Sequence, residues 1–138
     1  MTKRKMARRR KKGNLHLSRD FGRCRNLKDM KGGMPRVIRK ILGVARSAGC
    51  TIKKWHVVRY KPHQGYTLVA TIAESHFVVQ TWPERRFKPW VNLDIFICNY
   101  TRNNQEIARR LARLLEIFFG PREVMYFSPR LRGPFTGG

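Results

Sequence analysis

The chain has 138 residues, of which 31 are Lys or Arg and 8 are Asp or Glu, so its formal net charge is +23. This length predicts one domain with its own core, and a hydrophobic content of 41% excludes a chain that is only a disordered basic tail. Such an excess of positive charge favours a polyanionic partner, because each neutralised phosphate releases a counterion.

Signals for two other kinds of protein are missing from the sequence. No apolar stretch has the length of a membrane-spanning helix, and the N-terminus has no apolar signal core. The three cysteines, Cys24, Cys50 and Cys98, lie far apart, and neither they nor the four histidines have the spacing of metal ligands. We therefore expect no membrane partner, no metal, and free thiols in a reducing cytosol.

The first part of the chain predicts a basic arm, a strand and a helix. Residues 1–13 carry too many like charges to fold alone, so we expect either an arm that orders on nucleic acid or a solubilising tail. Alternation of side chains predicts a short strand over 15–21, followed by a polar, turn-rich segment over 22–33. Apolar residues at three- and four-residue spacing predict an amphipathic helix over 35–48.

Further strands and a second helix are expected in the rest of the chain. The second helix follows Asn103 or Asn104, buries a stripe from Ile107 to Phe118 and ends at Gly120. A turn at 61–65 and a basic loop at 85–89 separate strands. The segments rich in β-branched and aromatic residues predict strands over 51–60, 66–73, 76–82, 91–98 and 124–127.

These elements predict an α+β sandwich of the order β-α-β-β-β-α-β, with both helices on one face of an antiparallel-rich sheet. The domain is expected over 14–128, between the basic arm at 1–13 and a basic tail rich in Gly and Pro at 129–138. The arginines of both helices then share one outer surface, with few acidic residues to balance them. This imbalance favours a surface that faces phosphates.

A set of motifs in the middle of the chain resembles a known enzyme family. In order, the motifs are Gly65-Tyr66-Thr67, Ala73-Glu74-Ser75-His76, Thr81-Trp82-Pro83-Glu84, Asp94-Ile95-Phe96 and Cys98. The set resembles the self-cleavage region of the pyruvoyl-dependent S-adenosylmethionine decarboxylases in their short, prokaryotic form. The resemblance extends from about Leu15 to Gly133 and implies the fold of that family, in which two protomers pack their sheets together.

The resemblance also implies roles for individual residues. In the family, the serine matched by Ser75 attacks the carbonyl of the preceding residue, here Glu74, and elimination leaves a pyruvoyl group that serves as the electron sink for decarboxylation. Cys98 matches the family's proton-donating cysteine. Thr67 matches a hydroxyl residue that assists cleavage, and Glu84 matches a carboxylate that holds the ribose of the substrate.

Gln80 departs from the family pattern. The family places a histidine five residues after the serine and implicates it in cleavage as the base. A neutral imidazole accepts a proton near neutral pH, whereas a glutamine amide does not. Loss of general-base assistance typically costs about 10²–10⁴ in rate, so self-cleavage is expected to be very slow or absent.

Charge and the missing histidine together predict an RNA-binding structural protein, a ribosomal component built on a decarboxylase-like fold that has lost self-processing. Its expected location is the cytoplasm, on the ribosome, with no cofactor, and its expected partners are ribosomal RNA and neighbouring ribosomal proteins. The residues predicted to contact RNA are Lys3, Arg4, Lys5, Arg8, Arg9, Arg10, Lys11, Lys12, Arg36, Arg39, Lys40, Arg85, Arg86, Arg109, Arg113, Arg130 and Arg132.

Two alternatives stay open at this point. The first is an active, self-cleaving S-adenosylmethionine decarboxylase of polyamine synthesis, compatible with a homodimer. Its pyruvoyl group comes from Ser75, and its other site residues are Glu74, Cys98, Thr67 and Glu84. The second is a related pyruvoyl decarboxylase with another amino acid as substrate, for which Gln80 is a change of specificity.

Overall fold

The computed structural model describes residues 14–30, 34–60, 65–73, 75–83, 88–98 and 104–132. Their helices and strands are, in chain order, β1 (Asn14–Gly22), the 3-10 helix η1 (Arg25–Met30), α2 (Met34–Ser47), β2 (Ile52–Arg59), β3 (Tyr66–Ile72), β4 (Ser75–Trp82), β5 (Trp90–Cys98), α3 (Gln105–Phe119), β6 (Glu123–Tyr126) and β7 (Arg130–Arg132).

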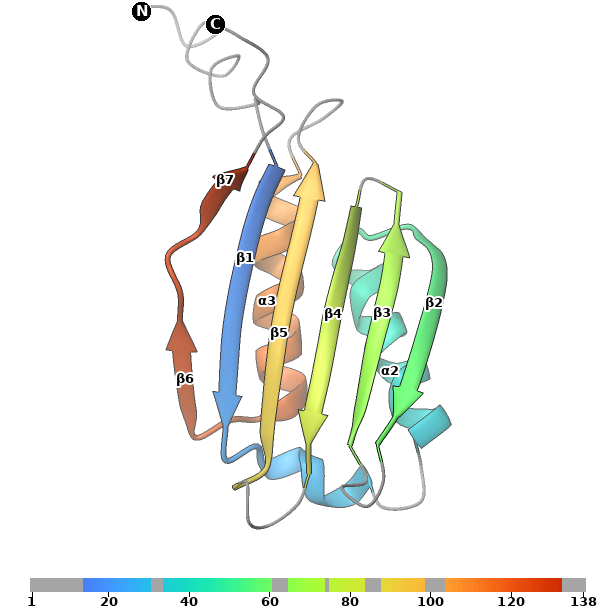
Figure 1. The fold of residues 1–138 in the computed structure, drawn as a ribbon, viewed down its shortest axis with the longest axis vertical. Helices are drawn as coiled ribbons and strands as arrows, with labels where there is room; N and C mark the ends of the chain where they lie inside the picture. Colours follow the sequence, from blue (N-terminus) through green and yellow to red (C-terminus); the bar gives the residue numbers. More distant parts are fainter. Residues whose placement is uncertain are drawn as a thin grey trace, which may run out of the picture.

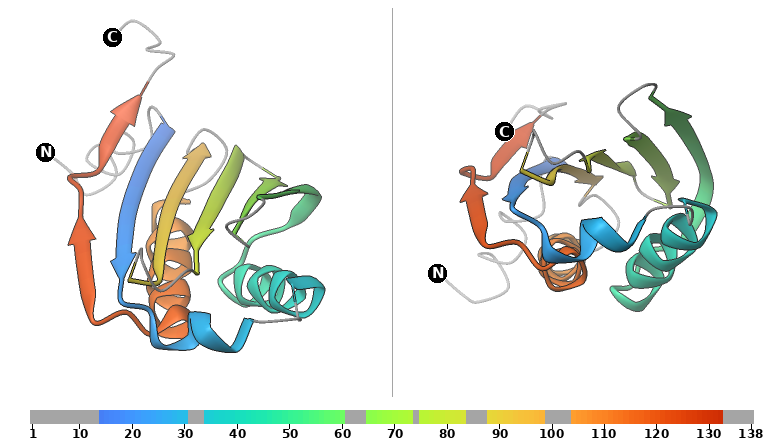
Figure 2. Two further views of the ribbon diagram at one scale, coloured as in Figure 1. Left: turned by 60° about the horizontal axis from the view of Figure 1, so that its bottom comes forward. Right: turned by 90° about the horizontal axis from the view of Figure 1, so that it is seen from below.

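The strands form one antiparallel sheet. Its order is β2-β3-β4-β5-β1-β6, and β7 also pairs with β1 (Figure 1). Both helices cover the same face of this sheet (Figure 2). No helix in the described part of the chain covers the other face, which is called the open face below.

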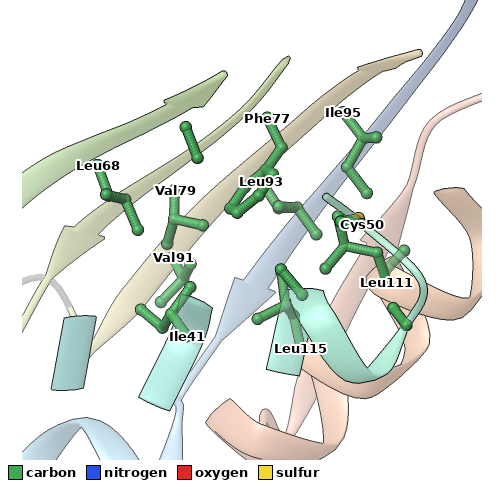
Figure 3. Packing of buried hydrophobic residues seen from close by; sticks show 14 of the residues in the cluster. Ile41, Cys50, Leu68, Phe77, Val79, Val91, Leu93, Ile95, Leu111 and Leu115 are labelled. Carbon is green, nitrogen blue, oxygen red and sulfur yellow. The ribbon is translucent and has the colours of Figure 1, made fainter. Parts of the chain in front are cut away.

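The core lies between the sheet and the two helices, because alternate side chains of each central strand point to one face. In β4, Phe77 and Val79 are fully buried, whereas their neighbours Val78 and Gln80 are only partly buried. The helices bury one stripe each against this layer, as the apolar spacing predicts. The shared core includes Ile41 of α2 with Leu111 and Leu115 of α3, together with Leu68, Phe77, Val79, Val91, Leu93 and Ile95 of the sheet (Figure 3).

Gly65 precedes β3 at a point where no side chain fits. A Cβ at this position would collide with the backbone carbonyl oxygen of Thr81. The Tyr66 N–H donates to the Thr81 hydroxyl at 3.1 Å, and the Tyr60 N–H donates to the Gly65 carbonyl oxygen at 2.8 Å. This close approach of the chain segments explains the glycine in the motif. It also fixes the register that places Thr67 opposite Gln80.

The predicted α+β class, with two helices on one face of an antiparallel sheet, is confirmed. The four strands between the helices match the four predicted ranges, so the written order β-α-β-β-β-α-β was one strand short. The structure also has two short elements that sequence periodicity did not indicate, because neither is longer than two periods of its pattern. These are η1, inside the segment expected to be turn-rich, and β7, inside the segment expected to be a basic tail.

Candidate active site

The open face holds the polar side chains of the central strands. On β4 these are His76 and Gln80, which alternate with the buried residues Phe77 and Val79. Contacts between strands confirm that the alternate residues share this face. His76 stacks on Phe96 of β5 with ring centroids 5.4 Å apart, and the same Phe96 ring lies 6.0 Å from the ring of His16 on β1.

Ser75 is the first residue of β4 and lies at one end of the sheet. Its Cα partners are Ile72 on β3 and Ile97 on β5, both buried. The Ser75 hydroxyl oxygen lies 3.5 Å from Nδ1 of the next residue, His76. Ser75 has a φ of 156°, a backbone region that is costly for a residue with a Cβ. The preceding residue, Glu74, lies outside the described residues.

Cys98 lies at the same end of the sheet as Ser75. It follows Ile97, the partner of Ser75, at the end of β5, and it is partly exposed. The sequence predicted Asn103 or Asn104 as a helix cap. Asn104 does precede α3, but its side chain forms no cap. Its amide instead donates to the Cys98 carbonyl oxygen at 2.6 Å, so Asn104 ties the start of α3 to the end of β5.

A second polar group lies toward the other end of the open face. Thr67 is the Cα partner of Gln80, and its hydroxyl lies 2.6 Å from the Tyr60 hydroxyl. Tyr60 stacks on Trp82 with ring centroids 6.5 Å apart. The Trp82 indole N–H donates to the Asn92 side-chain oxygen at 3.0 Å, which extends the group to β5.

The structure therefore separates residues that the family motif groups together. Gln80 follows Ser75 by five positions along β4, and five extended residues span about 16 Å. Within one chain, Thr67 and Gln80 form one group and Ser75 and Cys98 form another. Glu84 lies outside the described residues, so its position relative to either group is not described.

Where it is described, the centre of the open face carries acidic and no basic residues, whereas the flanking strands bring Lys54 of β2, the partner of Thr71, and Arg130 of β7, the partner of His16, to the same face. Within the described residues of β1, β3, β4 and β5, this face carries two acids, Asp20 and Asp94, and neither Lys nor Arg. Asp94 accepts hydrogen bonds from the Ser18 hydroxyl at 2.7 Å and from His16 Nε2 at 3.1 Å. Asp20 accepts a bond from the Asn92 amide at 2.9 Å. These hydrogen bonds hold both carboxylates on the open face.

The residues predicted to bind RNA lie outside the central strands of this face, although Arg130 of β7 is the partner of His16 at its edge. Those with described side chains are exposed on the outer sides of α2 and α3 or near the C-terminal end: Arg36, Arg39, Lys40, Arg109, Arg113 and Arg130. Arg132 belongs to β7, and only its backbone is described. The others lie outside the described residues: Lys3, Arg4, Lys5, Arg8, Arg9, Arg10, Lys11, Lys12, Arg85 and Arg86.

Two other kinds of site are missing from the described part of the chain. There, no three His, Cys, Asp or Glu side chains form a group that could hold a metal ion. No helix among the described residues is long and apolar enough to cross a membrane.

Comparisons with known proteins place the chain in a family. A family model described as S-adenosylmethionine decarboxylase matches residues 15–126. The chain is also 34% identical over 106 residues to the S-adenosylmethionine decarboxylase proenzyme of Aeropyrum pernix, a match that covers 74% of each chain. The chain belongs to the S-adenosylmethionine decarboxylase family.

Other members of the family match shorter parts of the chain. The proenzyme of Pyrobaculum neutrophilum is 31% identical over 71 residues, which is 48% of this chain and 55% of that protein. The crystal structure of the adenosylmethionine decarboxylase from Aquifex aeolicus superposes with a TM-score of 0.73, over 93% of this chain and 97% of that chain. Its sequence identity of 22% shows a shared fold. S-adenosylmethionine decarboxylases are pyruvoyl-dependent.

The prediction of an RNA-binding ribosomal protein is wrong. Membership of the S-adenosylmethionine decarboxylase family overturns it, and the predicted partners, ribosomal RNA and ribosomal proteins, fall with it. The physical reason is that a net charge of +23 states how many basic residues are in excess, without stating where they lie or what they bind. Net charge alone therefore does not distinguish a basic enzyme from a basic RNA-binding protein.

Sequence reasoning missed three contacts of the site: Ser75 with His76, Cys98 with Asn104, and Thr67 with Tyr60. His76 was part of the motif but was given no role. The signal for the second contact was Asn104 itself, which was interpreted only as a helix cap. Tyr60 lies next to the predicted turn, and only the register of β2 against β3 brings it to Thr67.

Proposed function

We propose that the chain is a self-cleaving S-adenosylmethionine decarboxylase whose pyruvoyl group derives from Ser75. Family membership supports the reaction class. The observation on this chain that best supports the proposal is that Ser75 and Cys98 lie at the same end of the sheet. There Ser75 begins β4, and Cys98 follows the strand partner of Ser75 on β5.

The residues at this end fit the formation of a pyruvoyl group. Ser75 is partly exposed, and its strand partners Ile72 and Ile97 present no charged side chain that would compete for its hydroxyl. The φ of 156° at Ser75 stores strain next to the bond to be cut. In this proposal, cutting the bond between Glu74 and Ser75 releases that strain.

Cleavage proceeds in balanced steps through Ser75. Its oxygen bonds to the Glu74 carbonyl carbon, the C–N bond breaks, and the hydroxyl proton ends on the Ser75 nitrogen. Loss of the Ser75 Cα proton then expels the Glu74 carboxylate by breaking the bond between Cβ and the ester oxygen. One water hydrolyses the remaining imine and releases ammonia. A terminal ketone of this kind supplies the electron sink for decarboxylation.

Cys98 is positioned to act on the product of decarboxylation. The resemblance gives its thiol the role of proton donor, and the thiol of this residue is partly exposed at the end of the sheet that Ser75 occupies. Cys24 and Cys50 are buried in the core. Burial raises the pKa of the Cys24 thiol to about 12, so Cys24 is poorly suited to exchange protons.

The electrostatics of the open face suit a cationic substrate. S-adenosylmethionine carries a sulfonium charge, and a like charge in the site would raise the cost of binding it. The central strands of this face present Asp20 and Asp94 and, among their described residues, neither Lys nor Arg. The basic residues of the helices are on the opposite side of the sheet. Most of the described excess charge is therefore away from the central strands, with Lys54 and Arg130 on the flanking strands of the open face.

A second copy of the chain completes the site in this proposal. Thr67 is about 16 Å from Ser75 along the strands, so it cannot assist cleavage in its own chain. When two open faces pack with their strands in opposite directions, the Thr67 end of one chain meets the Ser75 end of the other. The resemblance supports this arrangement, because protomers of the family pack their sheets together.

Release of labelled carbon dioxide from carboxyl-labelled S-adenosylmethionine tests the proposed function. We expect turnover by the purified wild-type chain, none by Ser75→Ala, and at least about a 100-fold loss for Cys98→Ala, the typical effect of removing a general acid. A matched control is Cys24→Ala, which removes a buried thiol near the start of β5, where the Cys24 N–H donates to the Pro89 carbonyl oxygen, at the opposite end of that strand from Cys98. Turnover by Ser75→Ala, or none by the wild type, would contradict the proposal.

A further inference from the structure

We propose that His76 is the general base for self-cleavage in this chain, the part that the family gives to the histidine at position 80. The inference deepens the proposed function and rests on it. Gln80 cannot accept the proton of the attacking hydroxyl. A chain that cleaves itself therefore needs another base within reach of Ser75.

The geometry around Ser75 points to its neighbour. The hydroxyl oxygen of Ser75 is 3.5 Å from Nδ1 of His76. This separation is longer than that of a formed hydrogen bond, about 2.6–3.2 Å, and catalytic contacts are often long before the reaction begins. Both groups are on the same chain and on adjacent residues, so their approach needs no rearrangement of the sheet.

Phe96 holds the imidazole in place. The His76 ring stacks on the Phe96 ring, with centroids 5.4 Å apart and planes 14° apart. Phe96 is the strand partner of His76 on β5, so the sheet itself fixes this stack. The stacked ring presents its edge, with Nδ1, toward Ser75. In the single chain, His76 is exposed.

Other candidates for the base are less well placed among the described residues. His16 is on β1, and its Nε2 lies 3.1 Å from Asp94 Oδ1 of β5. Its ring is on the far side of Phe96 from His76. Gln80 is five positions along the strand and pairs with Thr67 and Asn92. Among the described residues, the side-chain contact given for the Ser75 hydroxyl is the one to His76 Nδ1.

In the proposed step, neutral His76 removes the proton from the Ser75 hydroxyl through Nδ1. The Ser75 oxygen forms a bond to the Glu74 carbonyl carbon, and the bond from that carbon to the Ser75 nitrogen breaks. The imidazolium returns its proton to the departing nitrogen, which becomes the free amine of the ester. Protons and electrons balance without any other reactant.

Cleavage kinetics of chains made by cell-free translation test the inference, with denaturing electrophoresis to follow the split. We expect His76→Ala to slow cleavage by at least about 100-fold and added imidazole to restore much of the rate. Ser75→Ala should stay whole with or without imidazole. The matched control is His56→Ala, which removes an exposed histidine of β2, whose strand partner is Val69, and should cleave at the wild-type rate.

The outcomes separate this inference from the proposed function. Cleavage of His76→Ala at the wild-type rate, or a slow rate that imidazole does not raise, overturns the role of His76 and leaves the decarboxylase intact. A wild-type chain that stays whole contradicts both. If Gln80→His then cleaves, Ser75 and the scaffold are competent and His76 does not replace the missing base.

Discussion

Tyr66 illustrates how one buried hydroxyl affects stability. Its side chain is 3% exposed, and its oxygen has no hydrogen-bond partner among the described residues. Burying a polar group without a partner costs about 1–3 kcal/mol. The same burial raises the pKa of Tyr66 above its ordinary value of 10.0. The Tyr66 ring packs in the core, whereas its buried hydroxyl lowers the stability of the folded chain.

We therefore expect Tyr66→Phe to raise the free energy of unfolding by about 1 kcal/mol in urea denaturation. The matched control is Tyr60→Phe, which removes a hydroxyl paired with Thr67 at 2.6 Å and should lower stability by about 1 kcal/mol. A loss of stability in Tyr66→Phe would mean that its hydroxyl has a partner.

Tyr66→Phe should also change how the free energy of unfolding depends on alkaline pH. A raised pKa means that the folded state holds the proton more tightly than the unfolded state, so the stability is complete below pH 10 and is lost as pH rises further. Tyr66→Phe removes this contribution, and its stability should fall less steeply above pH 10 than that of the wild type.

At the scale of single residues, the sequence allowed Ser75, Cys98 and Thr67 to be named, because motif spacing is visible in one dimension. The contact of Ser75 with His76 was not predictable. Adjacent residues in a regular strand point to opposite faces, whereas Ser75, which has a φ of 156° at the start of β4, lies 3.5 Å from His76.

Gly65 and Gly43 differ in the space that their surroundings leave for a side chain. Gly65 precedes β3 against the Thr81 carbonyl oxygen, whereas Gly43 is exposed in α2 and a Cβ there would meet nothing within 4 Å. Gly65→Ala should lower stability by about 1–3 kcal/mol because it overpacks the strand. Gly43→Ala should raise stability by about 1 kcal/mol, the usual difference between the two residues in a helix.

Thermal or urea unfolding of the two variants measures this contrast. The pair makes the same chemical change, so any general effect of an added methyl group cancels. Equal effects of the two substitutions would show that the close approach at Gly65 does not set the register of β3 and β4.

At the scale of elements, periodicity predicted the long helices and strands well. For example, the alternation of β4 and β5 was visible, and both buried and open positions follow from it. The separation of Gln80 from Ser75 into two groups also follows from strand spacing, once Thr67 is known to pair with Gln80. The pairing itself depends on the approach of Gly65 to Thr81, which a single sequence does not show.

For the whole molecule, the distribution of charge matters more than its sum. A net charge of +23 led to the wrong partner because composition does not state on which face a residue lies. In the fold, the described arginines of α2 and α3 are exposed on the helix side. Asp20 and Asp94 remain on the open face. A strongly basic chain thus keeps, on the central strands of one face, a surface that suits a cationic substrate.

The most direct test of the account is the mass of the two parts of the purified wild-type chain. We expect a fragment that ends at Glu74 and a second fragment that begins at position 75 with a ketone in place of the serine amine. Borohydride should reduce that ketone and add two hydrogen atoms to the second fragment only. An intact chain with an unmodified Ser75 would contradict the central claim.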